Sequence, residues 1–220
     1  MGDLLHPTLL SLRIAVIATA LVTVVGVPLA FVLARRAFVG RSVIDVLLTL
    51  PLVLPPTVVG YALIALLGRR SWAGELLERL TGWTLLFNPD GAAIASAVVA
   101  LPLLYLPAKS AFAGVDRELE DVARLFGATP LQIFWHVSLP LARRGIAAGL
   151  LLAFARALGE FGATVMVLGI RTEQPTLPIS IYLDAETGPL TRALPAVLLL
   201  VAVSTLVLLV YNRWGVGERE

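Results

Sequence analysis

The sequence predicts an all-α integral membrane protein, and two observations carry this prediction. Of its 220 residues, 58% are hydrophobic and only 15% are charged, which is more apolar surface than a water-soluble domain of this size can bury. Uncharged apolar runs recur along the chain, and about 18 such residues in a row predict a helix that crosses the bilayer. The chain has no cysteine, which excludes disulfides and thiolate metal ligands.

About five segments are long enough to cross a hydrocarbon core of about 30 Å. They cover residues 14–34, 46–67, 91–108, 141–170 and 193–212. With the N-terminus outside and the C-terminus inside, ten Lys and Arg residues lie on the inner side against six on the outer side, as the positive-inside rule favours. We therefore expect one transmembrane domain over residues 1–220, with a cytoplasmic segment at 115–140.

The second expected span contains the sequence LPLVLPPTVVGY, with prolines at Pro51, Pro55 and Pro56. Each proline removes a backbone donor, so we expect a break or kink in this helix. A broken helix is tolerated in a membrane where protein or a water-filled cavity covers the freed carbonyls. The break is either a packing kink or part of a pathway. Five helices barely enclose a pore, which favours a dimer with the path at its interface.

Residues 115–140 form a polar insertion between apolar spans, and their pattern predicts two short helices. Apolar residues recur at helical spacing on one face of the first helix, at Val115, Leu119, Val122 and Phe126. Acidic residues crowd its first turns, as the helix dipole favours, and Gly127 is expected to end it.

The second short helix is predicted to begin at Thr129 and to end at Pro140. Thr129 is a good N-cap, Pro130 fits the first helical position, and Gln132 completes a T-x-x-Q capping box. The pair of helices could rest on lipid. The acidic polar face of the first helix suits an anionic leaflet poorly and favours docking in a groove of another protein.

This insertion resembles the cytoplasmic loop of importer permeases of the ATP-binding-cassette superfamily, which carries E-x-A-A-x-x-x-G-A followed by Φ-x-L-P. Here the matching residues are Glu120-Asp121-Val122-Ala123-Arg124-Leu125-Phe126-Gly127-Ala128 and Val137-Ser138-Leu139-Pro140. Val122 departs from the usual alanine. In that family the loop is a coupling helix that docks on a separate ATPase subunit. The resemblance implies that the coupling residues here are Glu120, Asp121, Ala123, Arg124, Gly127, Ala128, Pro130, Leu139 and Pro140.

Two charges interrupt the apolar run LLAFARALGEFGATVMVLG, namely Arg156 and Glu160. A charge within the bilayer costs roughly several kcal/mol unless it is paired or solvated. These two residues lie four apart, on one helical face. They form either a structural pair or a pair facing the pathway, where Arg156 would attract an anion. Gly159 and Gly162 are expected to permit close packing against another helix.

Several stretches resemble the molybdate-permease branch of the same superfamily, and the likeness covers most of the chain. These stretches are residues 155–164, 50–61, 68–70 and 176–182. The resemblance implies a type I importer fold in the bacterial cytoplasmic (inner) membrane and a homodimer of this subunit. It also implies two cytoplasmic ATPase subunits and an extracytoplasmic oxyanion-binding protein. Tungstate and sulfate permeases are relatives with overlapping motifs.

The sequence offers no candidate catalytic residues and no metal ligands. Its only histidines are His6 and His136, and neither has a partner at ligand spacing. We expect this chain to bind no cofactor, while ATP and Mg²⁺ are used by the partner ATPase. The net charge of +2 gives no reason to expect nucleic acid. A secondary transporter remains an alternative, although it would predict inverted repeats that are not apparent here.

Overall fold

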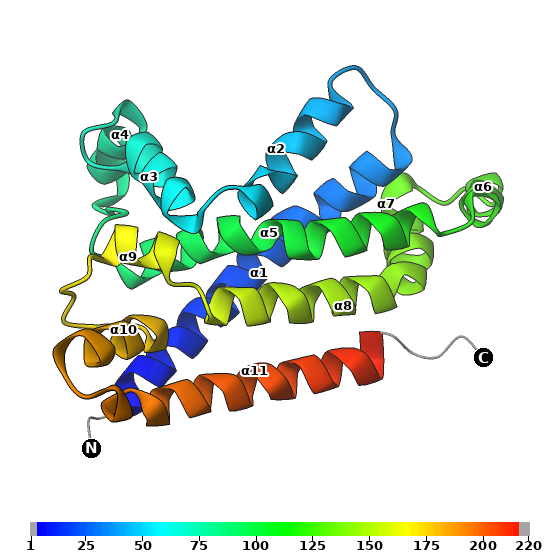
Figure 1. Ribbon diagram of the computed structural model, residues 1–220. Helices are drawn as coiled ribbons and strands as arrows, with labels where there is room; N and C mark the ends of the chain where they lie inside the picture. Colours follow the sequence, from blue (N-terminus) through cyan, green and yellow to red (C-terminus); the bar gives the residue numbers. More distant parts are fainter. Residues whose placement is uncertain (1–3, 216–220) are drawn as a thin grey trace.

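The computed structural model describes residues 4–215, and each regular element in this part of the chain is a helix (Figure 1). The elements are, in chain order, α1 (Leu5–Arg35), α2 (Arg41–Val53), α3 (Pro56–Leu67), α4 (Trp72–Thr81), α5 (Pro89–Ala113), α6 (Arg117–Leu125), α7 (Pro130–Ile133), the π-helical η1 (Phe134–Ser138), α8 (Leu139–Leu158), α9 (Gly162–Leu168), α10 (Leu177–Thr187), the 3₁₀-helical η2 (Leu190–Arg192) and α11 (Leu194–Gly215).

Within the described residues, four helices are long and apolar enough to cross a membrane, and the shorter apolar α3 adds to them. The four are α1, α5, the continuous stretch Pro130–Leu158 and α11. They run lengthwise, with α6 at one end and α4, α9 and α10 at the other (Figure 1). We call these the α6 end and the α10 end. Helix α1 starts at the α10 end and α11 finishes at the α6 end, as an odd number of crossings requires.

Helix α5 is the centre of the bundle, because it packs against both α1 and α8. The side chains of Tyr105 and Phe112 are fully buried in the main core cluster. Small residues let the helices approach closely. A Cβ on Gly149 of α8 would lie 3.0 Å from the Cα of Leu104 on α5. Close backbone approach of this kind is typical of helices that associate within membranes.

The predicted break in the second span is confirmed, and it lies between α2 and α3. Helix α2 ends at Val53, Pro55 is the N-cap of α3, and Pro56 is at its start. Pro51 is different, because it lies inside α2, and the predicted break at this proline is wrong. The chain remains helical past Pro51 as far as Val53, and the N–H of the C-cap residue Leu54 still donates to the Leu50 carbonyl at 3.2 Å.

The prediction that a helix ends at Pro140 is also wrong, since helical structure continues from Pro130 to Leu158. The π-helical segment η1 makes this possible. Its last turn closes through a bond from the Leu139 N–H to the Phe134 carbonyl. Pro140 then lies in the first turn of α8, where a missing N–H is tolerated. The expected span 141–170 instead breaks after Leu158, and α9 follows as a separate short helix.

Candidate coupling segment and intramembrane ion pair

Helix α6 has a defined start and a defined end, as expected for a rigid segment. The Asp116 side chain caps its N-terminus by accepting from the Glu118 N–H at 3.0 Å. At the C-terminus, Gly127 has φ = 85°, a left-handed conformation that glycine adopts without strain. The N–H of Gly127 donates to the Arg124 carbonyl and that of Ala128 to the Ala123 carbonyl. These two bonds form a Schellman motif, which confirms Gly127 as the stop signal.

The predicted capping box after Gly127 is also confirmed. The Thr129 N–H donates to Oε1 of Gln132 at 2.8 Å, and the Gln132 N–H donates to the Thr129 hydroxyl at 3.4 Å. Pro130 occupies the first helical position, where its lack of an N–H has no cost. The connection between α6 and α7 is therefore fixed at both sides of residue 127.

An exposed apolar surface covers α6 and the turn that follows it. Leu125 and Phe126 leave 87% and 88% of their surface exposed. The surface also includes Leu119, Val122, Leu131 and Trp135, and we call these six residues the exposed apolar face. Val115 does not belong to it, because α6 begins after the Asp116 cap and Val115 is buried. Six exposed apolar residues on one short segment favour an interaction with another surface.

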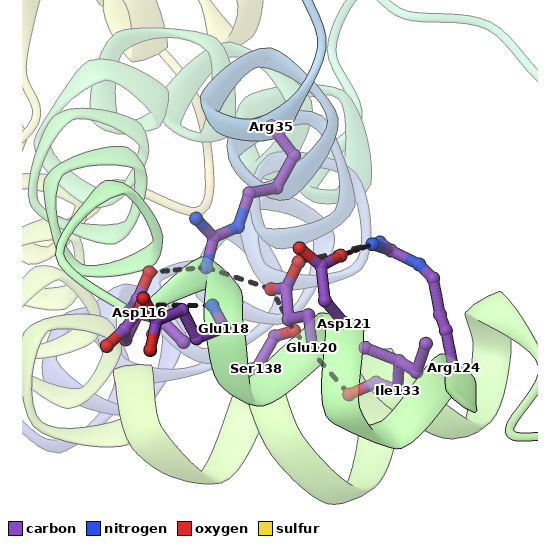
Figure 2. Close-up of polar contacts among 9 residues, drawn as sticks. Arg35, Asp116, Glu118, Glu120, Asp121, Arg124, Ile133 and Ser138 are labelled. Atoms are coloured by element: carbon purple, nitrogen blue, oxygen red, sulfur yellow. Dashed lines mark hydrogen bonds and ion pairs between the residues drawn. The ribbon is translucent and has the colours of Figure 1, made fainter. Parts of the chain in front are cut away.

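Glu120 is only 4% exposed, and its carboxylate points toward Arg35 and Ser138 (Figure 2). Its Oε1 lies 2.8 Å from Nη2 of Arg35 and accepts a hydrogen bond from the Ser138 hydroxyl at 2.8 Å. The sequence had placed Glu120 with the other charged residues on the polar sides of the helix. Asp121 and Arg124 do lie there, paired with each other and more than half exposed.

The base of the segment is held by an aromatic cluster that the sequence did not predict. The rings of Phe31 on α1 and Phe134 on η1 pack edge to face with centroids 4.9 Å apart. Phe112 on α5 meets Phe31 at 5.3 Å. Leu139 packs against the same core. Because these rings come from three separate helices, the residues before α8 are anchored to the centre of the bundle.

A second polar cluster attaches α2 to α5 and was likewise missed. The Asp45 carboxylate on α2 accepts hydrogen bonds from the Tyr105 hydroxyl and the Lys109 ammonium on α5. Arg41 lies 3.8 Å from the same carboxylate. Tyr105 and Lys109 are four residues apart near the end of an apolar run, a spacing that could have indicated a shared polar partner.

The predicted contact between Arg156 and Glu160 is confirmed. Arg156 Nη1 lies 2.6 Å from Glu160 Oε2, with the glutamate side chain 1% exposed and the arginine side chain 31% exposed. The other carboxylate oxygen accepts from the Ala163 N–H at 2.7 Å, in the first turn of α9. Glu160 thus lies in the break itself, where it pairs with Arg156 near the end of α8 and accepts a hydrogen bond from the start of α9.

Of the two glycines expected to permit close packing, only Gly162 does so within this chain. A Cβ on Gly162 would lie 3.0 Å from Cβ of Pro56 and 3.2 Å from N of Thr57, so α9 meets the start of α3. A Cβ on Gly60 would in turn lie 2.8 Å from Cβ of Met166. Within the described residues, a Cβ on Gly159 would meet only the Ala155 carbonyl, at 3.7 Å, an ordinary contact, so close packing at Gly159 stays a prediction.

The long apolar helices, the interrupted spans and the capped segment are the features of a multi-pass membrane protein. Residues 26–214 match the family described as "Binding-protein-dependent transport system inner membrane component", and the chain belongs to this family. In fold it is similar to the MetNI methionine ABC transporter, with a TM-score of 0.72 over 97% of each chain and 18% identity.

Similar proteins include permeases named for molybdenum transport and for sulfate transport. The chain is 40% identical to "Putative molybdenum transport system permease protein YvgM" of Bacillus subtilis, over 94% of this chain and 92% of that one. It is 43% identical to "Molybdenum transport system permease protein ModB" of Escherichia coli K12, over 81% and 79% respectively. Identity to "Sulfate transport system permease protein CysW" of Synechocystis is 38%, over 94% and 77%.

Proposed function

We propose that this chain is the permease subunit of an ATP-driven, binding-protein-dependent importer, and that it forms the membrane pathway for molybdate. The observation that carries the proposal is the rigidly capped α6 segment with its exposed apolar face, in a chain that belongs to this transport family. An amphipathic helix of this kind fits a groove of another protein. The names of the relatives supply the substrate.

The partner at the α6 end is a separate ATPase subunit, which uses ATP and Mg²⁺, while this chain binds no cofactor itself. Leu125 and Phe126 are the anchors of the docking surface, because they are the most exposed apolar residues on it. Asp121 and Arg124 lie at its charged rim, where they favour the correct orientation more than tight binding. Closure of the ATPase then displaces α6 relative to the spans.

In this proposal the α6 end faces the cytoplasm and the α10 end faces outward, where an extracytoplasmic binding protein delivers the anion. The excess of Lys and Arg in the segments on the α6 side supports this orientation. The chain is then a multi-pass protein of the bacterial cytoplasmic membrane, with its N-terminus outside and its C-terminus inside.

Two copies of the chain enclose the pathway in this proposal. Helix α2 supports this arrangement, because none of its residues is buried in the single chain, and it diverges from the bundle (Figure 1). Its apolar residues Val43, Val46, Leu47 and Val53 are more than half exposed. The break before α3 lies beside α9, so two interrupted spans meet at one level of the membrane.

The ion pair at this level offers a contact for an anion. Glu160 is buried and uses both carboxylate oxygens, whereas the Arg156 guanidinium stays partly exposed. The accessible part of the pair is therefore the cation, and we place it beside the pathway. The competing role is purely structural, with the pair holding α8 and α9 in register. Uptake by an Arg156→Leu variant that still dimerises separates the two roles.

The docking surface is tested by co-purification of the ATPase. Phe126→Glu places a charge in the centre of the apolar face, so we expect the ATPase to be lost from the purified complex. Leu80→Glu is the matched control, because Leu80 is equally apolar, is 75% exposed and lies on α4 at the other end. Retention of the ATPase by Phe126→Glu would exclude this face as the docking surface.

The substrate is tested by reconstituting this subunit with its ATPase and binding protein in liposomes. We expect ATP-dependent uptake of labelled molybdate that tungstate blocks and sulfate does not. Molybdate and tungstate have nearly the same size and charge, so the binding protein decides between them. Competition by sulfate would move the chain to the sulfate branch, and uptake without ATP would favour a secondary transporter.

A further inference from the structure

The last residue of α1 is inserted beneath α6. The Arg35 side chain is only 9% exposed although it follows a long apolar helix (Figure 2). Its Nη2 donates to the Val115 carbonyl at 2.8 Å, just before α6 begins, and pairs with Glu120 at 2.8 Å. One guanidinium nitrogen therefore contacts both the entry to α6 and a residue of its first turn.

Glu120 extends this contact to a third element. Its Oε1 also accepts from the hydroxyl of Ser138, which is fully buried at the end of η1 where α8 begins. The carboxylate thus joins α1, α6 and the start of α8 at one point. Helix α6 otherwise packs on its neighbours α7 and η1. The polar junction of Arg35, Glu120 and Ser138 connects α6 directly to two long spans.

Stability alone is a poor explanation for this junction. Moving each of the two ions out of water costs roughly several kcal/mol. A protein in which well-packed apolar residues of similar volume replace a buried ion pair is often as stable. What a buried and hydrogen-bonded ion pair adds is directional geometry, because the bonds are lost if the elements shift or rotate against one another. The junction lies between α6 and the two spans, where it keeps α6 from shifting relative to them.

We propose that Arg35 and Glu120 are positioning residues for coupling, and that they make α6 move as one body with the end of α1 and the start of α8. This inference rests on the proposed function and adds to it. Displacement of α6 by an ATPase is passed to α1 through the Arg35–Glu120 pair and to α8 through Ser138. Glu120 is consequently an internal link of this chain, and the contacts to the ATPase come from the exposed apolar face.

The chain offers matched controls for both residues. Arg36 follows Arg35 directly and is exposed, and Glu118 lies two residues before Glu120 and is exposed. The test compares Arg35→Met, Glu120→Gln and their combination with Arg36→Met and Glu118→Gln. Each is assembled with the ATPase and binding protein in liposomes, and three quantities are measured: thermal stability, ATP hydrolysis and molybdate taken up per ATP hydrolysed.

Glu120→Gln leaves the buried Arg35 without an acidic partner, and Arg35→Met leaves Glu120 with only Arg124, at 3.8 Å, so we expect both to lower thermal stability. The double variant has no unpaired buried charge, and we expect its stability to recover. Uptake per ATP should stay at least about fivefold below wild type in the double variant, because the link is absent. The two controls should match wild type in all three quantities.

Recovery of uptake per ATP together with stability in the double variant would overturn the proposal, because the pair would then be only structural. Arg35→Lys provides a second test that keeps a charge opposite Glu120. A lysine cannot reproduce the planar fork of arginine, so we expect a folded protein with intermediate uptake per ATP. Wild-type coupling in this variant would count against the proposal. If wild type itself shows no ATP-dependent uptake, the proposed function fails, and not this inference alone.

Discussion

Two Arg–Glu pairs with a buried glutamate lie in the described part of the chain, and they differ in what they connect. In both, the glutamate is almost completely buried and also accepts a hydrogen bond from another group, the Ser138 hydroxyl for Glu120 and the Ala163 N–H for Glu160. The pair of Arg156 and Glu160 is local, because Glu160 lies just past the end of α8, four residues after Arg156. The pair of Arg35 and Glu120 joins two elements that are far apart in the sequence.

This difference separates two uses of a buried charge. The local pair neutralises a charge within a span and caps the helix that follows the break, so its effect is confined to one level of the membrane. The long-range pair fixes how α6 lies on the bundle. We therefore expect substitutions in the first pair to affect folding most, and substitutions around α6 to affect coupling more than folding.

The largest effect is expected from Glu160→Ala, which removes both the partner of Arg156 and the acceptor for the Ala163 N–H. Loss of one partner of a buried pair costs about 3–5 kcal/mol, so thermal unfolding in detergent should occur at a clearly lower temperature. Glu160→Gln is the control, since its amide oxygen can still accept from Ala163, and it should lose less. Equal stability of the two variants would show that the cap contributes nothing.

A smaller loss of thermal stability is expected from Gly162→Val. This variant tests whether α9 packs closely on α3 beside the pair of Arg156 and Glu160. The added side chain meets Pro56 and the backbone at Thr57, and such overpacking costs about 1–3 kcal/mol. Gly159→Ala serves as the control, because its Cβ meets only an ordinary contact. Equal unfolding temperatures for both variants would contradict the packing of α9 on α3.

Gly127→Val tests the turn that ends α6. Open space surrounds this position, so the cost comes from the left-handed backbone alone and amounts to about 1–2 kcal/mol. We expect a folded protein that hydrolyses ATP but takes up less molybdate per ATP. Gly127→Asn should behave almost as wild type, because asparagine tolerates this conformation. Normal transport by the valine variant would show that the Schellman turn is not needed for coupling.

The smallest effect is expected from Asp121→Asn, directly beside the buried Glu120. Asp121 pairs with Arg124 at the surface, and exposed ion pairs contribute at most about 1 kcal/mol. The unfolding temperature of the Asp121→Asn variant should be close to that of wild type and far above that of Glu120→Gln. If the two variants were equally destabilised, burial would not be what distinguishes these adjacent acidic residues.

Features that depend on residues close together in the sequence were predictable. The Gly127 stop, the Thr129–Gln132 capping box and the Arg156–Glu160 contact each involve residues within about one helical turn. The same holds for the break at Pro55 and Pro56. A backbone that is already helical brings such residues together whatever the rest of the chain does, so their spacing is enough to predict the contact.

Prediction from the sequence failed where a helix end or the burial of a side chain depended on a neighbouring element. Pro140 looked like a helix end, but the π-helical turn before it kept the chain helical. Glu120 and Asp121 look equivalent in the sequence, and only the docking of α6 on η1 decided which of them is buried. Arg35 looked like an ordinary basic residue at the end of a span.

The sequence by itself determined that the chain is a helical membrane protein, that a break precedes α3, and where α6 ends and α7 begins. These properties follow from composition and from periodicity within single helices. Only the tertiary structure decided that Arg35 reaches Glu120, that Asp45 meets Tyr105 and Lys109, and that α3 and α9 meet at their breaks. Those contacts depend on how the helices are rotated and stacked, which is set by packing across the whole bundle and not by any one stretch of residues.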